Sequence, residues 1–494
     1  MAKKKRAQPV ITARQAQAEA LERFRCLLDE RSFAALLNEI QQPLYPALRI
    51  NPLKTNTEEF LHTAERYGWN LTPIPFCPTG WWVTASAAPI SQTLEHRMGH
   101  YYIQEAASML PVELFELSPD KPALILDMAA SPGGKSTHLV SRTLDRGLVI
   151  ANDSGLERIT ALRLVLQTWG AANAAVTRFP GEKFGRWFPE TFDRVLLDAP
   201  CSMQALRSTD THPMRAISTR EQSALARRQV NLLASALSAV KIGGQVVYST
   251  CTLTPEENEA VLDELLRRFP GVFSIEDLSA RLPAPAPALP RAYGHEFFPE
   301  VQRAARLWPH IYHTAGFFAA LICKTAPLAF PAEFPPARPL RDTGQEPLSA
   351  NQTKRFLHDF TARYGHHPAE VLETQRLVLW RSPRAIYAVP QTFLERFATL
   401  PCQLLGLKIA EGGLENWALA HEWSARFGRY FSAGRIKLPT DNLEAWLRGE
   451  DIPWRSDDPA TGEVVVVFDT DGRFIGRGRI LHGLLKNLLP RRLI

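Results

Sequence analysis

The sequence predicts an α/β fold with a doubly wound parallel sheet between about residues 100 and 325. Short β-branched or apolar runs alternate there with longer segments of helical spacing, the pattern of parallel strands joined by right-handed crossovers. The 494 residues predict about three domains at roughly 150 residues each. Proline-rich stretches at 281–290 and 327–347 indicate a loop inside the core and a linker after it.

Six strands are expected in this core. They are Ala123–Met128, Leu148–Asn152, Ala175–Arg178, Arg194–Asp198, Gln245–Ser249 and Gly316–Lys324. Apolar spacing predicts helices over Leu156–Thr168 and Arg220–Val240. The segment Thr254-Pro-Glu-Glu257 predicts the start of another helix, with Thr254 as the N-cap, Pro255 at N1 and Glu257 completing a capping box.

The end of the chain predicts a small β-rich module. Glu463–Phe468 is a β-branched run, Asp469–Gly472 has the composition of a hairpin turn, and Arg473–Ile480 predicts the returning strand.

Composition excludes several classes of protein. The 45% hydrophobic and 22% charged residues are typical of a globular protein, and no apolar run approaches the roughly 18 residues that a membrane span needs. Six scattered cysteines and the lack of an apolar N-terminal stretch predict a reduced, cytoplasmic protein.

The net charge of +6 is concentrated near the two ends of the chain. The basic residues there are Lys3, Lys4, Lys5 and Arg6, followed at the other end by Arg473, Arg477, Arg479, Lys486, Arg491 and Arg492. Such clusters attract polyanions, although a solvated surface is the alternative for each cluster taken alone.

The turn after the first expected strand predicts a nucleotide-like cofactor. It reads Leu126-Asp-Met-Ala-Ala-Ser-Pro-Gly-Gly-Lys-Ser-Thr137, and its small residues let backbone N–H groups approach a ligand at the carboxyl edge of the sheet. Asp153, after the second strand, is placed to accept both hydroxyls of a ribose. Gly134-Lys-Ser136 fits part of a phosphate-binding loop, but Ala129 replaces the leading glycine, which argues against ATP or GTP. A plain helix start is the alternative.

Two cysteines follow neighbouring strands, in Leu196-Leu-Asp-Ala-Pro-Cys-Ser202 and Tyr248-Ser-Thr-Cys-Thr252. Both are therefore expected at the ligand edge of the sheet. A thiolate is a strong nucleophile, and N–H groups at the helix start near Thr254 are expected to help stabilise a Cys251 thiolate. Buried structural cysteines are the alternative. No metal is expected, because neither cysteine has a second ligand at C-x-x-C spacing.

These motifs carry a resemblance to a known family. The segments 127–137, 198–202, 249–258 and 309–318 resemble the Sun (NOL1/NOP2) family of S-adenosylmethionine-dependent RNA cytosine-C5 methyltransferases. Arg49–Lys54, Tyr67–Trp69, Thr72–Pro75 and Gly99–Ser108 are similar to the bacterial 16S rRNA (cytosine-C5) methyltransferase F subgroup. The ending at 476–490 is similar to the PUA-like RNA-binding module of that subgroup.

The resemblance implies S-adenosylmethionine as cofactor and a role for each matching residue. Cys251 is implied as the nucleophile that adds to C6 of cytosine, which makes C5 reactive towards a methyl group. Asp198 is implied to bind the cytosine edge, and Cys201 to assist product release. The implied cofactor-binding residues are Ala129, Ala130, Ser131, Pro132, Gly133, Lys135, Asp153 and, in part, Asp198.

The implied substrate is structured RNA, above all 16S rRNA of the small ribosomal subunit. Transfer RNA is the alternative substrate, and a catalytically inactive RNA-binding protein is the alternative function. The chain departs from the family pattern at 203–208, beside the expected substrate pocket, and at Pro180-Gly181, near the expected adenine position. A monomer without membrane contact is expected.

The resemblance also implies a division into modules. We expect an N-terminal RNA-binding extension at 1–99, the methyltransferase core at 100–326, the proline-rich linker at 327–348, a central α+β module at 349–433 and the PUA-like RNA-binding module at 434–494.

Overall fold

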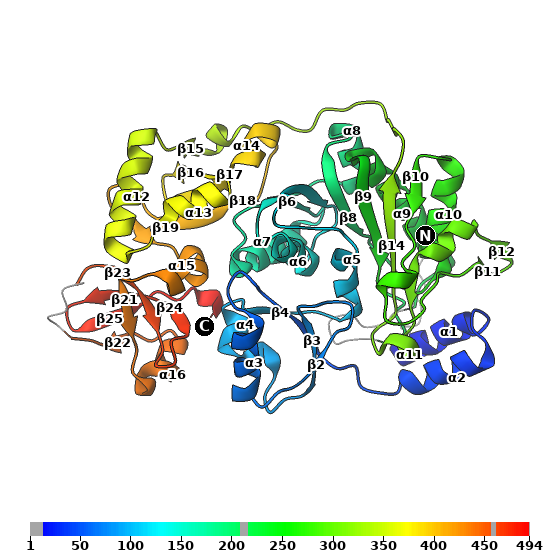
Figure 1. The fold of residues 1–494 in the computed structure, drawn as a ribbon, viewed down its shortest axis with the longest axis horizontal. Helices are drawn as coiled ribbons and strands as arrows, with labels where there is room; N and C mark the ends of the chain where they lie inside the picture. The colour runs from blue at the N-terminus through cyan, green and yellow to red at the C-terminus, as the bar shows by residue number, and fades with distance from the viewer. Residues whose placement is uncertain (1–12, 208–215, 456–460, 494) are drawn as a thin grey trace, which may run out of the picture.

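A computed structural model describes residues 13–207, 216–455 and 461–493. The basic cluster at residues 3–6 lies outside the described residues. Four main sheets follow one another along the chain, and the largest lies in the middle of the molecule (Figure 1). Among the described residues no helix has the length and apolar composition needed to cross a membrane.

The core is one mixed sheet of nine strands. Its strands are, in order across the sheet, β10 (Phe273–Ile275), β14 (Phe317–Lys324), β9 (Val240–Thr250), β8 (Phe192–Asp198), β5 (Ala123–Asp127), β6 (Gly147–Asn152), β7 (Ala174–Thr177) and β18 (Leu404–Leu405), with β13 (Ala305–Leu307) paired to β14. The five strands from β9 to β7 are parallel. The six expected strands are all present, and the doubly wound core is confirmed. The expectation of parallel strands is wrong for the sixth, because β14 pairs with β9 in the antiparallel direction.

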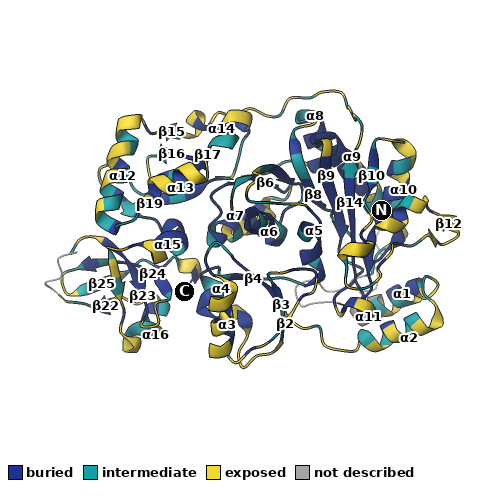
Figure 2. Cartoon of the chain, viewed as in Figure 1, coloured by how far each residue is buried: buried dark blue, intermediate teal, exposed yellow. Residues whose placement is uncertain are grey.

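Helices cover both faces of this sheet. They are α5 (Leu110–Glu113), α6 (Gly134–Arg142), α7 (Leu156–Trp169), α8 (Phe184–Trp187), α9 (Thr219–Ala239), α10 (Glu259–Arg268) and α11 (Pro309–Tyr312). Leu124 and Leu126 of β5 pack with α8, α9 and α10, whereas Ile125 packs with α5, α6 and α7. The continuous apolar runs of the central strands follow from this burial on two sides, which Figure 2 shows in dark blue.

The expected helix start at Thr254 is confirmed only as a 3₁₀ turn, and the expected capping box is wrong. Residues Pro255–Glu257 form a short 3₁₀ turn, α10 begins only at Glu259, and the Thr254 side chain caps no backbone N–H. Glu257 does not complete a capping box, because its buried carboxylate accepts instead from the backbone N–H of Ser202, in the turn that follows β8.

The N-terminal region forms a second sheet in the order β2 (Asn70–Pro73), β3 (Gly80–Ala85), β1 (Ala47–Ile50) and β4 (Tyr101–Ile103). Its helices are α1 (Ala13–Arg25), α2 (Glu30–Glu39), α3 (Thr57–Arg66) and α4 (Leu94–Arg97). Phe60, Trp69 and Tyr101 form its aromatic core. Because β4 pairs with β1, this sheet extends past residue 99.

Two further sheets follow the core. The first contains β15 (Glu346–Pro347), β16 (Leu377–Ser382), β17 (Ala385–Pro390), β19 (Leu407–Glu411) and β20 (Ala418–Leu419), with α12 (Ala350–Tyr364), α13 (Pro368–Thr374), α14 (Gln391–Phe397) and α15 (His421–Phe427). The second contains β21 (Arg435–Lys437), β23 (Val464–Phe468), β24 (Phe474–Leu481), β25 (Leu484–Asn487) and β22 (Ile452–Pro453), with α16 (Leu443–Leu447). The expected β-rich ending is confirmed.

Strand pairing and ion pairs connect the core to the region that follows it in the chain. Strand β18 lies in the region of the chain between β17 and β19 but pairs with β7 of the core sheet. Arg426 of α15 donates to the buried Asp145 carboxylate and to the Gly170 carbonyl of the core.

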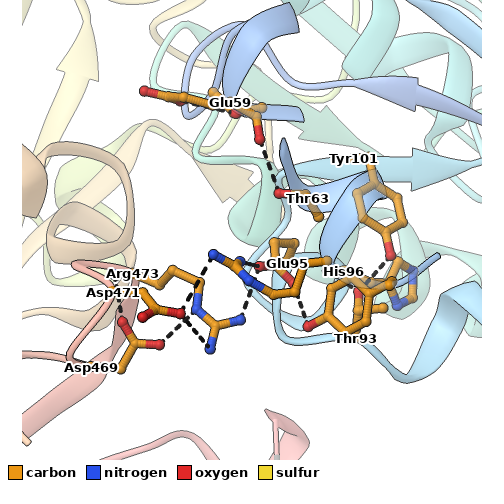
Figure 3. A network of polar contacts seen from close by, with 12 residues as sticks. Glu59, Thr63, Thr93, Glu95, His96, Tyr101, Asp469, Asp471 and Arg473 are labelled. Atoms are coloured by element: carbon orange, nitrogen blue, oxygen red, sulfur yellow. Dashed lines mark hydrogen bonds and ion pairs between the residues drawn. The ribbon is translucent and has the colours of Figure 1, made fainter. Parts of the chain in front are cut away.

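Glu95 joins the N-terminal region to the C-terminal module (Figure 3). Its buried carboxylate lies 3.3 Å from a guanidinium nitrogen of Arg66 and 3.3 Å from one of Arg473, and accepts a 2.9 Å hydrogen bond from Tyr67 Oη. Arg473 also lies 2.6 Å from Asp469. The segment around α3 and α4 and the C-terminal module thus lie side by side.

Candidate active site

The candidate site lies at the carboxyl edge of the core sheet. Strands β5, β6, β8 and β9 are parallel neighbours in this sheet, so their carboxyl ends meet there. Asp127 ends β5, Asp153 follows β6, Asp198 ends β8 and Cys251 follows β9. The topology thereby assembles residues that are far apart in the sequence.

The turn between β5 and α6 is held from two sides. Gly133 has φ of 117°, and an added Cβ would lie 2.9 Å from a Val165 methyl group of α7, so the turn packs against that helix only with glycine here. Arg49 of β1, fully buried, donates to the Gly134 carbonyl at 3.0 Å and to Thr137 Oγ1 at 2.8 Å. The N-terminal sheet therefore supports the turn, a role for Arg49 that its sequence position did not reveal.

Asp153 lies where the sequence predicts a ribose carboxylate. It is buried and accepts from the backbone N–H of Gly155 at 2.8 Å and of Ser131 at 3.4 Å. Its Oδ1 also lies 2.9 Å from a guanidinium nitrogen of Arg158, whose side chain is 53% exposed. A ligand that reaches Asp153 must share it with Arg158 or displace this exposed side chain.

Asp127 offers an unsatisfied acceptor at the same edge. Its Oδ2 accepts a 2.6 Å hydrogen bond from Ser136 Oγ, while its Oδ1 is buried and has no partner among the described residues. Burial raises the pKa of this carboxyl to about 7. A cationic or N–H group of a bound ligand would satisfy this oxygen.

Asp198 is fixed through both carboxylate oxygens. Lys135 Nζ lies 2.7 Å from Oδ2, and Ser249 Oγ donates to Oδ1 at 2.7 Å. Burial by itself lowers the pKa of Lys135, but the charge of Asp198 and its hydrogen bond hold that pKa above the ordinary value. The site thus contains an oriented, charged pair.

The two cysteines predicted from strand ends lie together. Cys201 Sγ and Cys251 Sγ are 3.1 Å apart, and both side chains are partly exposed. The hydrogen bond with Cys251, burial, and the nearby charges of Cys251 and Glu257 raise the pKa of Cys201 well above its ordinary value. Cys201 is therefore a neutral thiol beside Cys251. Because α10 starts only at residue 259, no regular helix begins at Thr254 to stabilise a Cys251 thiolate.

The atypical loop after Cys201 is packed, up to residue 207, against the N-terminal helices. Arg207 lies 2.8 Å from Glu39 of α2 and donates to the Gln42 carbonyl at 2.9 Å. Leu206 is fully buried with Phe24 and Trp308. Residue 208 lies outside the described residues.

The basic C-terminal cluster is only partly available to a polyanion. Arg473 is paired with Glu95 and Asp469, and Arg477 is buried against Glu411 at 2.8 Å. These two arginines therefore have acidic partners within the protein. Lys486 and Arg491 are exposed.

Comparison with known proteins decides the family. The chain matches the family described as 16S rRNA methyltransferase RsmB/F over residues 114–323, the N-terminal domain of 16S rRNA methyltransferase RsmF over 18–106 and the methyltransferase RsmF PUA domain over 433–494. A relative from Aeromonas hydrophila, named ribosomal RNA small subunit methyltransferase F, is 35% identical over 461 residues, 92% of each chain. The chain belongs to the ribosomal RNA small subunit methyltransferase F family.

Two further comparisons agree with methyltransferase F membership. A relative of the same name from Erwinia tasmaniensis is 32% identical over 477 residues, 95% of this chain and 94% of the relative. A crystal structure of a methyltransferase homolog protein from Pyrococcus horikoshii is 29% identical and has a TM-score of 0.51, covering 62% of this chain and 99% of that one. The Rossmann-like core and the PUA module are thus confirmed.

The site fits S-adenosylmethionine, the cofactor of methyltransferase F. The 129–133 turn after β5 consists of small residues and one proline, and Asp153 and the unsatisfied Asp127 Oδ1 are acceptors close to it in the fold. This chain is an RNA methyltransferase.

Proposed function

We propose that this enzyme methylates C5 of a cytosine in 16S rRNA of the small ribosomal subunit through a covalent adduct between Cys251 and C6. The observation that carries the proposal is the 3.1 Å approach of Cys251 Sγ to Cys201 Sγ beside the fixed carboxylate of Asp198. Two thiols and an oriented acidic group at a ligand edge are the groups that this chemistry needs.

Cys251 is the nucleophile in this proposal. Cytosine C5 is too weakly nucleophilic to take a methyl group directly, so the sulfur adds to C6 and gives C5 enamine character. Bound S-adenosylmethionine supplies the methyl group. Asp198, held by Lys135 and Ser249, is assigned to hydrogen-bond the cytosine edge and to hold the base in place while the adduct forms.

Cys201 serves the second half of the reaction. After methylation C5 carries both a methyl group and a proton, and the proton must leave before the sulfur is expelled. Cys201 is the other thiol within reach of Cys251, which supports its assignment to product release.

In this proposal the turn after β5, which the sequence predicts to bind a nucleotide-like ligand, holds the cofactor. We assign Ala129, Ala130, Ser131, Pro132, Gly133 and Lys135 to the methionine end, and Asp153 to the ribose. We add Asp127 to these residues, because it ends β5 directly before this turn and its Oδ1 has no partner among the described residues.

RNA recognition is assigned to the parts that flank the core. A cytosine within structured RNA must be flipped out to reach the thiols, which requires binding surface beyond the site itself. The N-terminal region and the PUA module, joined through Glu95, supply that surface in this proposal. The relatives' names support small-subunit rRNA over transfer RNA. Action as a cytoplasmic monomer is part of the proposal.

The test is methyl transfer from tritiated S-adenosylmethionine to deproteinised small-subunit RNA, assembled subunits, transfer RNA and DNA, followed by mapping of the modified nucleotide. The proposal predicts 5-methylcytosine in 16S rRNA, either free or in subunits. Label in transfer RNA alone supports the alternative substrate, and no label in any RNA supports an inactive RNA-binding protein.

A further inference from the structure

Glu257 connects the loops that carry the two cysteines. It lies in the 3₁₀ turn Pro255–Glu257, six residues after Cys251, and its side chain reaches the turn that contains Cys201. The residue is fully buried. Its only sequence interpretation, as a helix-capping residue, is wrong, so its carboxylate has a different role.

Four donors surround the Glu257 carboxylate. Ser202 donates its backbone N–H at 3.0 Å to Oε2 and its hydroxyl to Oε1. Gln229 of α9 donates to Oε2 at 2.9 Å, and Thr254 Oγ1 donates to Oε1 at 2.8 Å. A buried carboxylate with this many donors is held in one orientation, and it fixes the backbone immediately after Cys201.

The turn of Cys251 has additional support from Asn258. Asn258 accepts from Thr250 Oγ1 at 2.6 Å and donates to the Thr252 carbonyl at 2.9 Å. Glu257 thus binds the backbone directly after Cys201, whereas Asn258 binds the residues on both sides of Cys251. The two turns are joined by Ser202 Oγ and Thr252 Oγ1, which lie 3.1 Å apart.

The groups that act on the Cys201 thiol are consistent with this division. The Cys251 hydrogen bond, burial and the charges of Cys251 and Glu257 raise the pKa of Cys201, while the Met203 backbone N–H opposes them. Cys201 therefore has a proton to donate.

We propose, on the basis of the function proposed above, that Glu257 is a positioning residue for Cys201 that holds its thiol as the proton donor to Cys251 during product release. In that step the C5–H bond breaks and its proton passes to water. The electron pair of this bond forms the C5–C6 double bond, and the C6–S bond breaks with its pair going to Cys251 Sγ. The Cys251 sulfur takes the Cys201 proton, and Cys201 regains a proton from the hydronium formed.

The test compares Glu257→Gln with Glu256→Gln, a matched neighbour whose carboxylate pairs at 3.1 Å with Arg23 near the surface. Adduct formation and decay are followed on denaturing gels in single-turnover reactions with 16S rRNA and S-adenosylmethionine. Glu257→Gln should form the adduct at nearly the wild-type rate and release it about tenfold or more slowly, since a positioned proton donor contributes about 10²–10⁴-fold. Glu256→Gln should match the wild type in both steps.

Wild-type release by Glu257→Gln overturns the inference, and so does an equal slowing of formation and release, which a purely structural role produces. Thermal unfolding and cofactor binding report whether the variant is folded. If Glu257→Gln is not folded, Ser202→Ala is tested in its place. This variant removes one of the four hydrogen bonds to Glu257, and its adduct formation and release are measured in the same way. If Cys201→Ala fails to trap any adduct, the proposed function itself fails, which is a different result from normal release by Glu257→Gln.

Discussion

Lys135 Nζ lies 2.7 Å from Asp198 Oδ2, joining the turn after β5 to the end of β8. The pair links a residue of the cofactor turn to the carboxylate assigned to the cytosine. Asp198 ends β8, and Lys135 lies in the first turn of α6, which follows β5, the parallel neighbour of β8; their contact follows from this topology.

Lys135→Met should leave Asp198 without its charged partner and reduce kcat/KM by roughly 10-fold to 100-fold, because a hydrogen bond to a charged group is worth about 1.5–3 kcal/mol. Steady-state kinetics on 16S rRNA measure this loss. Ser249→Ala, which removes the neutral donor on the other oxygen, should lose less. Equal losses would show that the charge of Lys135 has no special role.

Asp153→Ala should weaken S-adenosylmethionine binding by about 1.5–3 kcal/mol, the range for a hydrogen bond to a charged group. Arg158→Ala should bind at least as tightly as the wild type, because the exposed Arg158 guanidinium competes for the same carboxylate. Calorimetry measures the dissociation constant of S-adenosylmethionine for both variants. If Arg158→Ala loses as much as Asp153→Ala, the ion pair holds Asp153 in place rather than competing with the ligand.

Arg426→Ala should lower the free energy of unfolding by about 3–5 kcal/mol, because it leaves the buried Asp145 carboxylate without its cation. Denaturant unfolding measures the change. Arg448→Ala removes an exposed ion pair with Glu444 and should cost less than about 1 kcal/mol. Similar values for the two variants would contradict the docking of α15 on the core.

Replacing Lys486 and Arg491 with Gln should weaken RNA binding and reduce the slope of log K against log salt by about 0.7 for each phosphate that is no longer neutralised. Arg477→Gln should instead destabilise the fold, because its side chain is buried against Glu411 and the Leu419 carbonyl. Binding titrations at several salt concentrations test the first expectation. An unchanged slope would mean that the exposed residues form a solvated face.

The sequence is sufficient to predict the core strands and the edge where the cysteines meet. Uninterrupted apolar runs such as Ala123–Asp127 are required by burial on two sides, and parallel strands bring their carboxyl ends together. Each of these local patterns predicts a buried parallel strand. Because Cys201 and Cys251 follow neighbouring parallel strands, the sequence is enough to predict that the two thiols lie close together.

The partners in long-range polar contacts could not be predicted from the sequence. Glu257 follows Thr-Pro-Glu in a pattern typical of a helix start, and nothing nearby indicates Ser202 or Gln229 as its partners. Arg477 likewise looks like part of a surface cluster until β24 packs it against Glu411. The identity of an ion-pair partner depends on tertiary packing, which residue spacing along one segment does not determine.

The most direct test of covalent catalysis is the amount of protein–RNA complex that survives SDS when Cys201→Ala and Cys251→Ala are each incubated with 16S rRNA and S-adenosylmethionine. The account predicts a stable complex for Cys201→Ala, which attacks but releases poorly, and none for Cys251→Ala, which lacks the nucleophile. A complex formed by Cys251→Ala, or identical behaviour of the two variants, would contradict the assignment of attack to Cys251 and release to Cys201.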